Sequence, residues 1–250
     1  MPTNWKRYEE LRPEQLAELT ARVPVAYWPL GLLEHHGWHL PVGFDGIKAQ
    51  RLCQRLAERT GGVLLPVMWW GWGGGHGDFR WTHYQQRDAS CAIIHDTVGQ
   101  LLNSGLRVIV LLAGHYPWQA ILDQVMPPYR QSHPDALLLW GTEMNLGAPQ
   151  VQISGDHAAR EETSMGLELL PELVDTATPG RGRDKGAWPR TGAPDPDARH
   201  PGVCFDPDSP QFAQMGTDAR EASAAHGADA LAPLIDHVTA IIKSHLKTTA

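Results

Sequence analysis

Histidines and carboxylates gather in the segment EHHGWHLPVGFD, which runs from Glu34 to Asp45. In an extended backbone Glu34 and His36 project to the same side, because side chains alternate in direction. Two carboxylates and an imidazole form a mixed oxygen and nitrogen ligand set that suits zinc, manganese or iron. A polar loop whose histidines only make hydrogen bonds would have the same sequence, so this segment alone leaves both interpretations open.

Two further polar groups follow later in the chain. His115 follows the apolar run RVIVLLA after one glycine, Gly114, and His157 precedes a predicted helix whose first turn carries Glu161 and Glu162. Histidine titrates near neutral pH, so His157 could act as a general acid or base. Acids in a first helical turn also interact favourably with the helix dipole, so a purely structural role for Glu161 and Glu162 is an equal alternative to a functional one.

The elements that position these residues alternate between strands and helices. This alternation predicts an α/β fold with parallel strands, helices on both faces and right-handed crossovers. Polar residues at strand ends then meet at the carboxyl edge of the sheet. The predicted strands span Val23–Leu33, Val63–Met68, Arg107–Ala113 and Ala136–Trp140. The predicted helices span Asp45–Arg59, Asp88–Leu102, Pro117–Met126 (ended by Pro127 and Pro128), Ala159–Leu170 and most of Gly216–Leu246.

Length and composition narrow the class of protein. A chain of 250 residues fits one α/β domain, so we expect residues 1–250 to form a single domain. The net charge of −7 argues against nucleic acid or an anionic membrane surface as a partner. No apolar run approaches the ~20 residues of a membrane helix. Three widely spaced cysteines and a polar N-terminus predict a reduced, cytoplasmic protein.

A glycine- and tryptophan-rich stretch, WWGWGGGHGDFRWTHY, lies between Trp69 and Tyr84. It lacks the Lys-Ser/Thr pair of a phosphate-binding loop. We predict that it covers a substrate, with Trp72 as an apolar wall and His76 and Asp78 as polar contacts. Aromatic residues are also enriched at interfaces, so a contact between subunits is an equal alternative.

Together the polar blocks resemble the creatininase (creatinine amidohydrolase) family. Its pattern is similar to P-x-G-x-x-E-Q-H-G-x-H-L-P…D, followed by G-H-(G/Y) and by H-A-x-x-x-E-T-S. Here the blocks read PLGLLEHHGWHLPVGFD, LLAGHYPWQ and DHAAREETS, in the same order. The resemblance implies a three-layer α/β/α sandwich with a mostly parallel central sheet. It also implies a homo-oligomer, commonly a hexamer.

The resemblance also implies one or two divalent ions per chain, Zn2+ or Mn2+ with Fe2+ as an alternative. Glu34, Asp45 and His115 would hold the first ion, while His36 and the bridging Asp45 would contribute to the second. Beside these ligands, His157 matches the family's proton-carrying histidine, Glu162 is assigned a supporting catalytic role, and the retained Tyr116 is expected to contact substrate.

Departures from the family pattern concern the substrate. Pro117 stands where creatinine-cleaving members have a glutamate ligand of the second ion. The tryptophan expected near Ile153 is also absent. The second ion site is therefore weak, rebuilt from Glu161 or His35, or absent, and creatinine itself is not the expected substrate.

The sequence thus predicts a metal-dependent hydrolase of a small cyclic amide, formamide or related C–N bond, in which metal-bound hydroxide attacks a carbonyl. One alternative is a C–C hydrolase that opens a cyclic diketone, such as an oxidised inositol or sugar. Another is a non-catalytic family member that serves in binding or assembly.

Overall fold

The computed structural model describes residues 4–146, 154–177 and 184–248. Five strands in this part of the chain form a sheet with the order β1-β3-β2-β4-β5, and every neighbouring pair is parallel. The predicted α/β class is therefore confirmed. The strands are β1 (Trp5–Arg7), β2 (Val25–Leu30), β3 (Gly62–Leu64), β4 (Val108–Ala113) and β5 (Leu137–Thr142).

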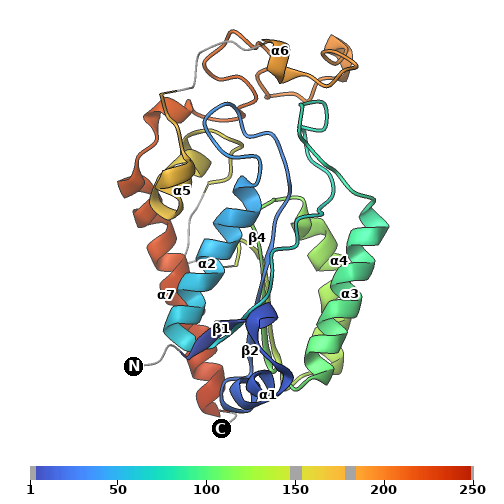
Figure 1. Ribbon diagram of the computed structural model, residues 1–250, viewed down its shortest axis with the longest axis vertical. Coiled ribbons are helices and arrows are strands. Elements are labelled where there is room, and N and C mark those ends of the chain that lie inside the picture. Colours follow the sequence, from blue (N-terminus) through green and yellow to red (C-terminus); the bar gives the residue numbers. More distant parts are fainter. Residues whose placement is uncertain (1–3, 147–153, 178–183, 249–250) are drawn as a thin grey trace.

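Helices cover both faces of the sheet and complete the three predicted layers (Figure 1). One face packs against α2 (Phe44–Thr60), α5 (Arg160–Leu169) and α7 (Ala224–Thr248), and the other against α1 (Pro13–Arg22), α3 (Arg87–Asn103) and α4 (Trp118–Ser132). A short helix, α6 (Asp184–Ala187), lies beyond the carboxyl edge of the sheet. Within the described ranges, the helices lack the combination of length and apolar character that a membrane crossing requires.

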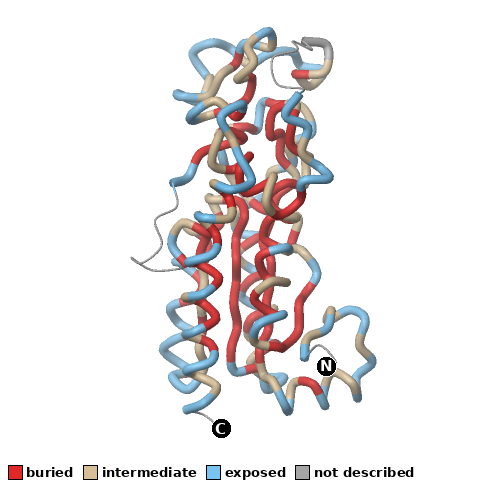
Figure 2. Tube along the Cα trace, turned by 90° about the vertical axis from the view of Figure 1, so that its left-hand side faces the viewer, coloured by how far each residue is buried: buried red, intermediate tan, exposed pale blue. Residues whose placement is uncertain are grey.

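The central strands β2 and β4 position the polar residues. Every residue of both strands is buried, because helices cover both faces (Figure 2). This explains why the strands are continuously apolar instead of alternating. The register pairs Leu30 with Ala113, so the two strands end side by side. The residues that follow them therefore emerge at one edge of the sheet.

Helix α4 is longer than its sequence predicts. It continues through Pro127 and Pro128 to Ser132, so the predicted end at Met126 is wrong. Each proline removes the hydrogen bond to a carbonyl four residues earlier, here those of Asp123 and Gln124. Both of these residues are exposed, so solvent can hydrate the freed carbonyls. The buried face of the helix therefore continues unbroken.

Residues 184–216 form a cap segment over the carboxyl edge of the sheet (Figure 1). Phe205 and Phe212 of this segment pack against Phe79 in a separate apolar cluster. The backbone of Met215 pairs with that of His157 through two hydrogen bonds of 2.9 Å. The cap segment is thus anchored directly beside the polar residues.

Candidate metal centre

The polar residues predicted from the sequence meet at the carboxyl ends of β2 and β4. Glu34 and His36 follow β2, Asp45 lies in the first turn of α2, and His115 follows β4. All four are at most 4% exposed. Gly114 permits this approach, because a Cβ atom there would lie 2.0 Å from the carbonyl oxygen of Asp45.

Glu34, Asp45 and His115 form the first group that could hold a metal ion. The Nδ1 atom of His115 lies 3.0 Å from Glu34 Oε2 and 3.2 Å from Asp45 Oδ2. The Nε2 atom of His115 donates to the carbonyl of Gly73 at 2.8 Å. This bond fixes the proton on Nε2, so in the neutral ring the Nδ1 lone pair faces the carboxylates.

His36 faces a second set of carboxylate oxygens. Its Nδ1 atom donates to the carbonyl of Glu34 at 3.1 Å. Its Nε2 atom lies 3.1 Å from Asp45 Oδ1 and 3.6 Å from Glu162 Oε2. Asp45 thus offers one oxygen to each group, which is the arrangement of a carboxylate that bridges two ions.

Glu162, and neither Glu161 nor His35, supplies the carboxylate that faces His36. Glu161 pairs with Arg160 and His226 instead. The ring of His35 stacks on Phe79, 5.4 Å between centroids. The position of Glu162 in the first turn of α5 directs it toward His36 in the loop after β2.

The charges of this buried site fit divalent ions. His36 Nε2 and Asp45 Oδ2 are buried without a hydrogen bond, although ligand atoms surround them. Burial alone would lower the pKa of His36, but Asp45, Glu162 and Glu34 raise it to about 9. The pKa of His115 is likewise raised, because Glu34 and Asp45 outweigh its burial. The carboxylates therefore attract positive charge, which divalent ions supply while leaving the imidazoles neutral.

His157 lies against the histidines of this site. Its ring stacks on His36 at 4.3 Å and on His76 at 3.4 Å between centroids. Its Nε2 atom donates to the carbonyl of His35 at 2.9 Å. Burial and the neighbouring histidines hold the pKa of His157 well below its usual value. His157 is therefore neutral at pH 7, with its Nδ1 lone pair free.

A buried lysine beside the site has no counterpart in the sequence-based prediction. Lys48 Nζ lies 2.7 Å from Glu143 Oε1 and 2.8 Å from Glu162 Oε1. Both Lys48 and Glu143 are completely buried. Burial lowers the pKa of Lys48, but the two carboxylates raise it above its ordinary value. One signal was available, since Lys48 lies three residues after Asp45 and thus on the same helical face.

Asp156 was also not assigned a role from the sequence. Its oxygens accept the N–H groups of Glu161 at 2.6 Å and Glu162 at 3.0 Å, so it caps the start of α5. Burial and the Glu162 carboxylate raise the pKa of Asp156 to about 7. Asp156 therefore fixes the helix turn that presents Glu162.

Tyr84 should support metal binding, because its hydroxyl donates to Glu34 Oε1 at 2.8 Å and accepts the N–H of His76 at 2.9 Å. We expect Tyr84→Phe to weaken binding of the ion beside Glu34 by about 10–100-fold. Competition with a chromophoric chelator measures this affinity. Tyr129→Phe is the control, since Tyr129 donates to the carbonyl of His95 on the surface. Equal affinities for the two variants would contradict this role.

A cavity of about 190 Å³ opens onto the ligand groups. Tyr116, predicted to contact substrate, lines it, and its hydroxyl oxygen is buried without a hydrogen-bond partner. Trp72 and Asp78 do not line it: Trp72 packs beside α3 with Arg87 over its ring, and Asp78 is exposed. Ile153 lies outside the described residues. The lining residues are Glu34, Asp45, Gly74, Gly75, His76, Gly114, His115, Tyr116, Pro117, Asp156, His157, Glu162, His200 and Met215.

Comparison with known proteins places this site in a family. A family model described as "Creatininase: Creatinine amidohydrolase" matches residues 9–242. The creatinine amidohydrolase of Pseudomonas putida is 26% identical over 207 residues, which cover 68% of this chain and 71% of that protein.

Solved structures share the fold. A crystal structure of creatinine amidohydrolase (creatininase) has a TM-score of 0.71 and 24% identity, and covers 98% of each chain. Two further creatininase structures, one described as the Zn-Zn type and one as "Creatininase Mn", have TM-scores of 0.69 and 23% identity and cover 97–98% of this chain and 98% of theirs. The chain therefore belongs to the creatininase family of amidohydrolases.

Proposed function

We propose that the chain is a single-domain, divalent-metal-dependent hydrolase that cleaves a C–N bond in a small cyclic amide or formamide. The observation that carries this proposal is the convergence of three buried carboxylates on the inward-facing nitrogens of buried histidines. Imidazole together with carboxylate suits Zn2+ or Mn2+. The creatininase structures of the Zn-Zn type and with Mn support the same choice of metals.

Each residue of the centre has a proposed role in holding the ions. Glu34, Asp45 and His115 would hold the first ion. His36, Asp45 and Glu162 would hold the second. When bound, such ions activate water and polarise a carbonyl oxygen.

His157 is the proposed proton carrier. Its neutral ring can take the proton released as water adds to the carbonyl carbon. The C–N bond then breaks, and His157 returns the proton to the departing nitrogen. The hydrogen bond to the carbonyl of His35 keeps its Nδ1 atom directed inward throughout.

The lining of the cavity supports a small, uncharged substrate. None of its described lining residues is lysine or arginine, so its side chains offer no charged partner for a phosphate or carboxylate group away from the ions. The unpartnered hydroxyl of Tyr116 can donate a hydrogen bond to substrate. Pro117 fills the position of the creatinine-specific glutamate, which favours a substrate other than creatinine.

His157→Asn tests the proton-carrying role. We expect turnover to fall by about 10²–10⁴-fold, the usual contribution of a positioned acid or base. Ligand atoms of His157, His36 and Glu162 lie within 4.8 Å of one another, so the metal content separates the two roles of His157, and it should stay unchanged if His157 carries the proton and His36, Asp45 and Glu162 hold the second ion. Metal analysis and steady-state kinetics measure the two quantities. Loss of the ions together with turnover would mean that His157 acts as a ligand instead.

A substrate panel decides which bond is cleaved. We expect turnover of lactams or formamides when the panel also includes keto-cyclitols and creatinine. Turnover of keto-cyclitols alone would assign the C–C ring-opening reaction and exclude C–N cleavage. If no compound is turned over and no ion is bound, the chain is a non-catalytic member of its family.

We further propose that copies of this cytoplasmic chain associate, with a hexamer as the expected form. Trp70, Trp81 and Ile93 are 48%, 55% and 42% exposed, although large apolar side chains are normally buried. Aromatic residues are enriched at interfaces. Light scattering measures the mass of the assembly.

A further inference from the structure

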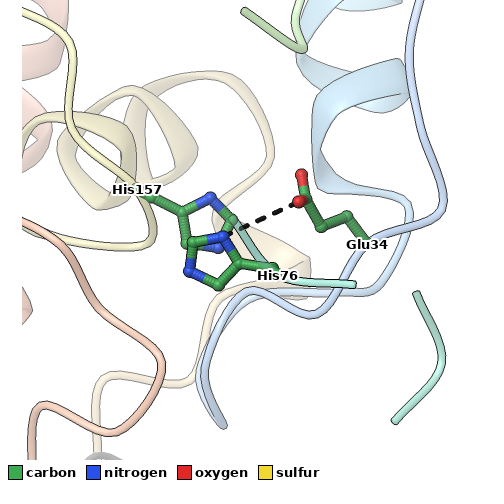
Figure 3. Close-up of side chains that lie close together, drawn as sticks. All are labelled: Glu34, His76 and His157. Carbon is green, nitrogen blue, oxygen red and sulfur yellow. Dashed lines mark ion pairs between the residues drawn. The ribbon is translucent and has the colours of Figure 1, made fainter. Parts of the chain in front are cut away.

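Three stacked imidazole rings enclose the proposed proton carrier. The His157 ring lies 3.4 Å from that of His76, with 19° between their planes, and 4.3 Å from that of His36, with 28° between their planes, measured between centroids. Two rings this close cannot share one face of His157 without overlapping, so they cover its opposite faces. Figure 3 shows the rings of His76 and His157 lying against each other. Only the rim of the His157 ring, which carries both nitrogens, is therefore left for other contacts.

His76 is the member of this stack that has no role in the proposed centre. It is 3% exposed and lines the cavity, but it belongs to neither ion position. The lone pair of an imidazole nitrogen lies in the plane of its ring, and the planes of His76 and His157 are nearly parallel. The two residues therefore contact each other through their faces, and not through a hydrogen bond or a shared ligand.

Hydrogen bonds hold His76 in place at both ends. Its backbone N–H donates to the hydroxyl of Tyr84 at 2.9 Å, and its Nε2 atom donates to the carbonyl of Ala213 at 3.0 Å. Ala213 adopts a left-handed backbone conformation with φ of 63°, which is uncommon for a residue other than glycine. The ring of Phe79 lies 5.3 Å from that of His76. His76 thus presents a fixed flat surface to His157.

His36 presents the opposite surface, and its own ring is fixed by the bond from Nδ1 to the carbonyl of Glu34. His157 itself is held at its rim by one hydrogen bond, from Nε2 to the carbonyl of His35. A single bond of this kind fixes Nε2 but lets the rest of the ring tilt around it. The two covering rings prevent that tilt, so they determine where the Nδ1 atom of His157 lies.

We propose that His76 is a positioning residue: its ring packs His157 against His36 and thereby holds the Nδ1 atom of His157 where the proton is transferred. This role rests on the proposed function, in which that atom takes a proton from water and returns it to the departing nitrogen. Proton transfer requires both groups to lie within hydrogen-bonding distance of the carrier. The ring of His76 carries the role, and its nitrogens do not.

Two substitutions separate the ring of His76 from its hydrogen bond. His76→Phe keeps a flat ring against His157 but cannot donate to Ala213, whereas His76→Gln keeps an N–H group near the place of Nε2 but removes the ring. Because a misplacement of about 1 Å costs about 100-fold in rate, we expect kcat to fall by about 10–100-fold in the glutamine variant and by less than about fivefold in the phenylalanine variant. KM and metal content should stay unchanged in both variants, since His76 holds neither the substrate nor an ion.

His133→Gln is the matched control. His133 is half-buried and its ring lies 6.1 Å from that of Tyr129, just before β5 begins at the amino edge of the sheet. The control removes an imidazole that packs beside another ring, at the end of the molecule opposite the ion positions. Its kcat should equal that of the unaltered protein.

NMR relaxation of the histidine rings tests the positioning without any substrate. In the metal-loaded, unaltered protein the His157 ring should be rigid, with an order parameter near 0.85, and in His76→Gln it should fall below about 0.6. His76→Phe should keep the ring rigid. The measurement on the unaltered protein needs no folded variant.

The outcomes distinguish this role from its alternatives. Equal losses of kcat in the two His76 variants would assign the role to the nitrogens of His76, and a loss confined to His76→Phe would assign it to the bond with Ala213; either result overturns the proposal. An unchanged kcat in His76→Gln, a change in metal content, or a mobile His157 ring in the unaltered protein overturns it as well. If the ring is rigid only when residue 76 carries a ring, but no compound of the panel is turned over, the proposed function fails and the positioning of His157 stands.

Discussion

Asp45→Asn should remove both ions and nearly abolish turnover. Asp45 is the residue whose two oxygens face different histidines, His36 at 3.1 Å and His115 at 3.2 Å. An amide has one oxygen and no charge, so it cannot bridge two cations. We expect the metal content to fall from two ions to less than one per chain. Turnover should fall by more than about 100-fold. Removing a group that only supports a ligand costs up to about 100-fold, and removing the ligand itself should cost more.

The control is Asp96→Asn, which removes the same charge from an exposed position on α3. Metal analysis after dialysis, together with kinetics on the substrate from the panel, compares the two variants. Circular dichroism confirms that both are folded. If Asp45→Asn retains two ions per chain, Asp45 is not the bridging ligand.

The fold could be predicted wherever burial leaves a local pattern. β2 and β4 are buried on both faces and therefore appear as continuous apolar runs, and α2 begins and ends within one residue of its predicted bounds. β1 could not be found in this way, because three edge residues are too few for any periodicity. α1 does carry a local signal, with Pro13 in its first turn and Leu19 on its buried side.

Chain positions and the family resemblance singled out four candidate ligands, Glu34, His36, Asp45 and His115, whereas Glu162 was assigned only a supporting catalytic role. Glu34 and His36 share one short segment, and the ends of parallel strands bring His115 to the same edge. Lys48 and Glu143 are 95 positions apart, and nothing in one sequence pairs them. A lysine on a buried helical face shows that a partner exists, but not which residue provides it.

The aromatic residues show the limit of composition as a guide. Trp72 in the glycine- and tryptophan-rich stretch was expected to form a wall of the substrate cavity, yet no tryptophan is among the described lining residues, and Trp70 and Trp81 of the same stretch are about half exposed. Phenylalanines of the cap segment, Phe205 and Phe212, pack beside the site instead. A loop without periodicity gives no indication of where its side chains point.

Lys48→Met should strongly destabilise the metal-free protein. Lys48 supplies the positive charge between the buried Glu143 and Glu162, and methionine fills a similar volume without that charge. Removing one partner of a buried ion pair leaves an uncompensated charge, so we expect the free energy of unfolding to fall by about 3–5 kcal/mol. Denaturation in urea with a chelator present measures this loss.

The environment of the lysine predicts how that loss will vary. Burial already raises the pKa of Glu143, so in the Lys48 variant Glu143 should take up a proton at low pH and lose its uncompensated charge. The difference in unfolding free energy between the variant and the unaltered protein should therefore grow as pH rises. Divalent ions beside Glu162 should also compensate for the missing charge, so metal should stabilise the variant more than the unaltered protein.

Arg51→Met on the same helix breaks an exposed pair with Glu172 and should cost less than about 1 kcal/mol, with no dependence on metal. Equal losses of unfolding free energy in the two variants would show that Lys48 does not compensate these carboxylates. A metal-dependent loss found only in the Lys48 variant would show that Lys48, Glu143 and Glu162 are coupled to the ion site.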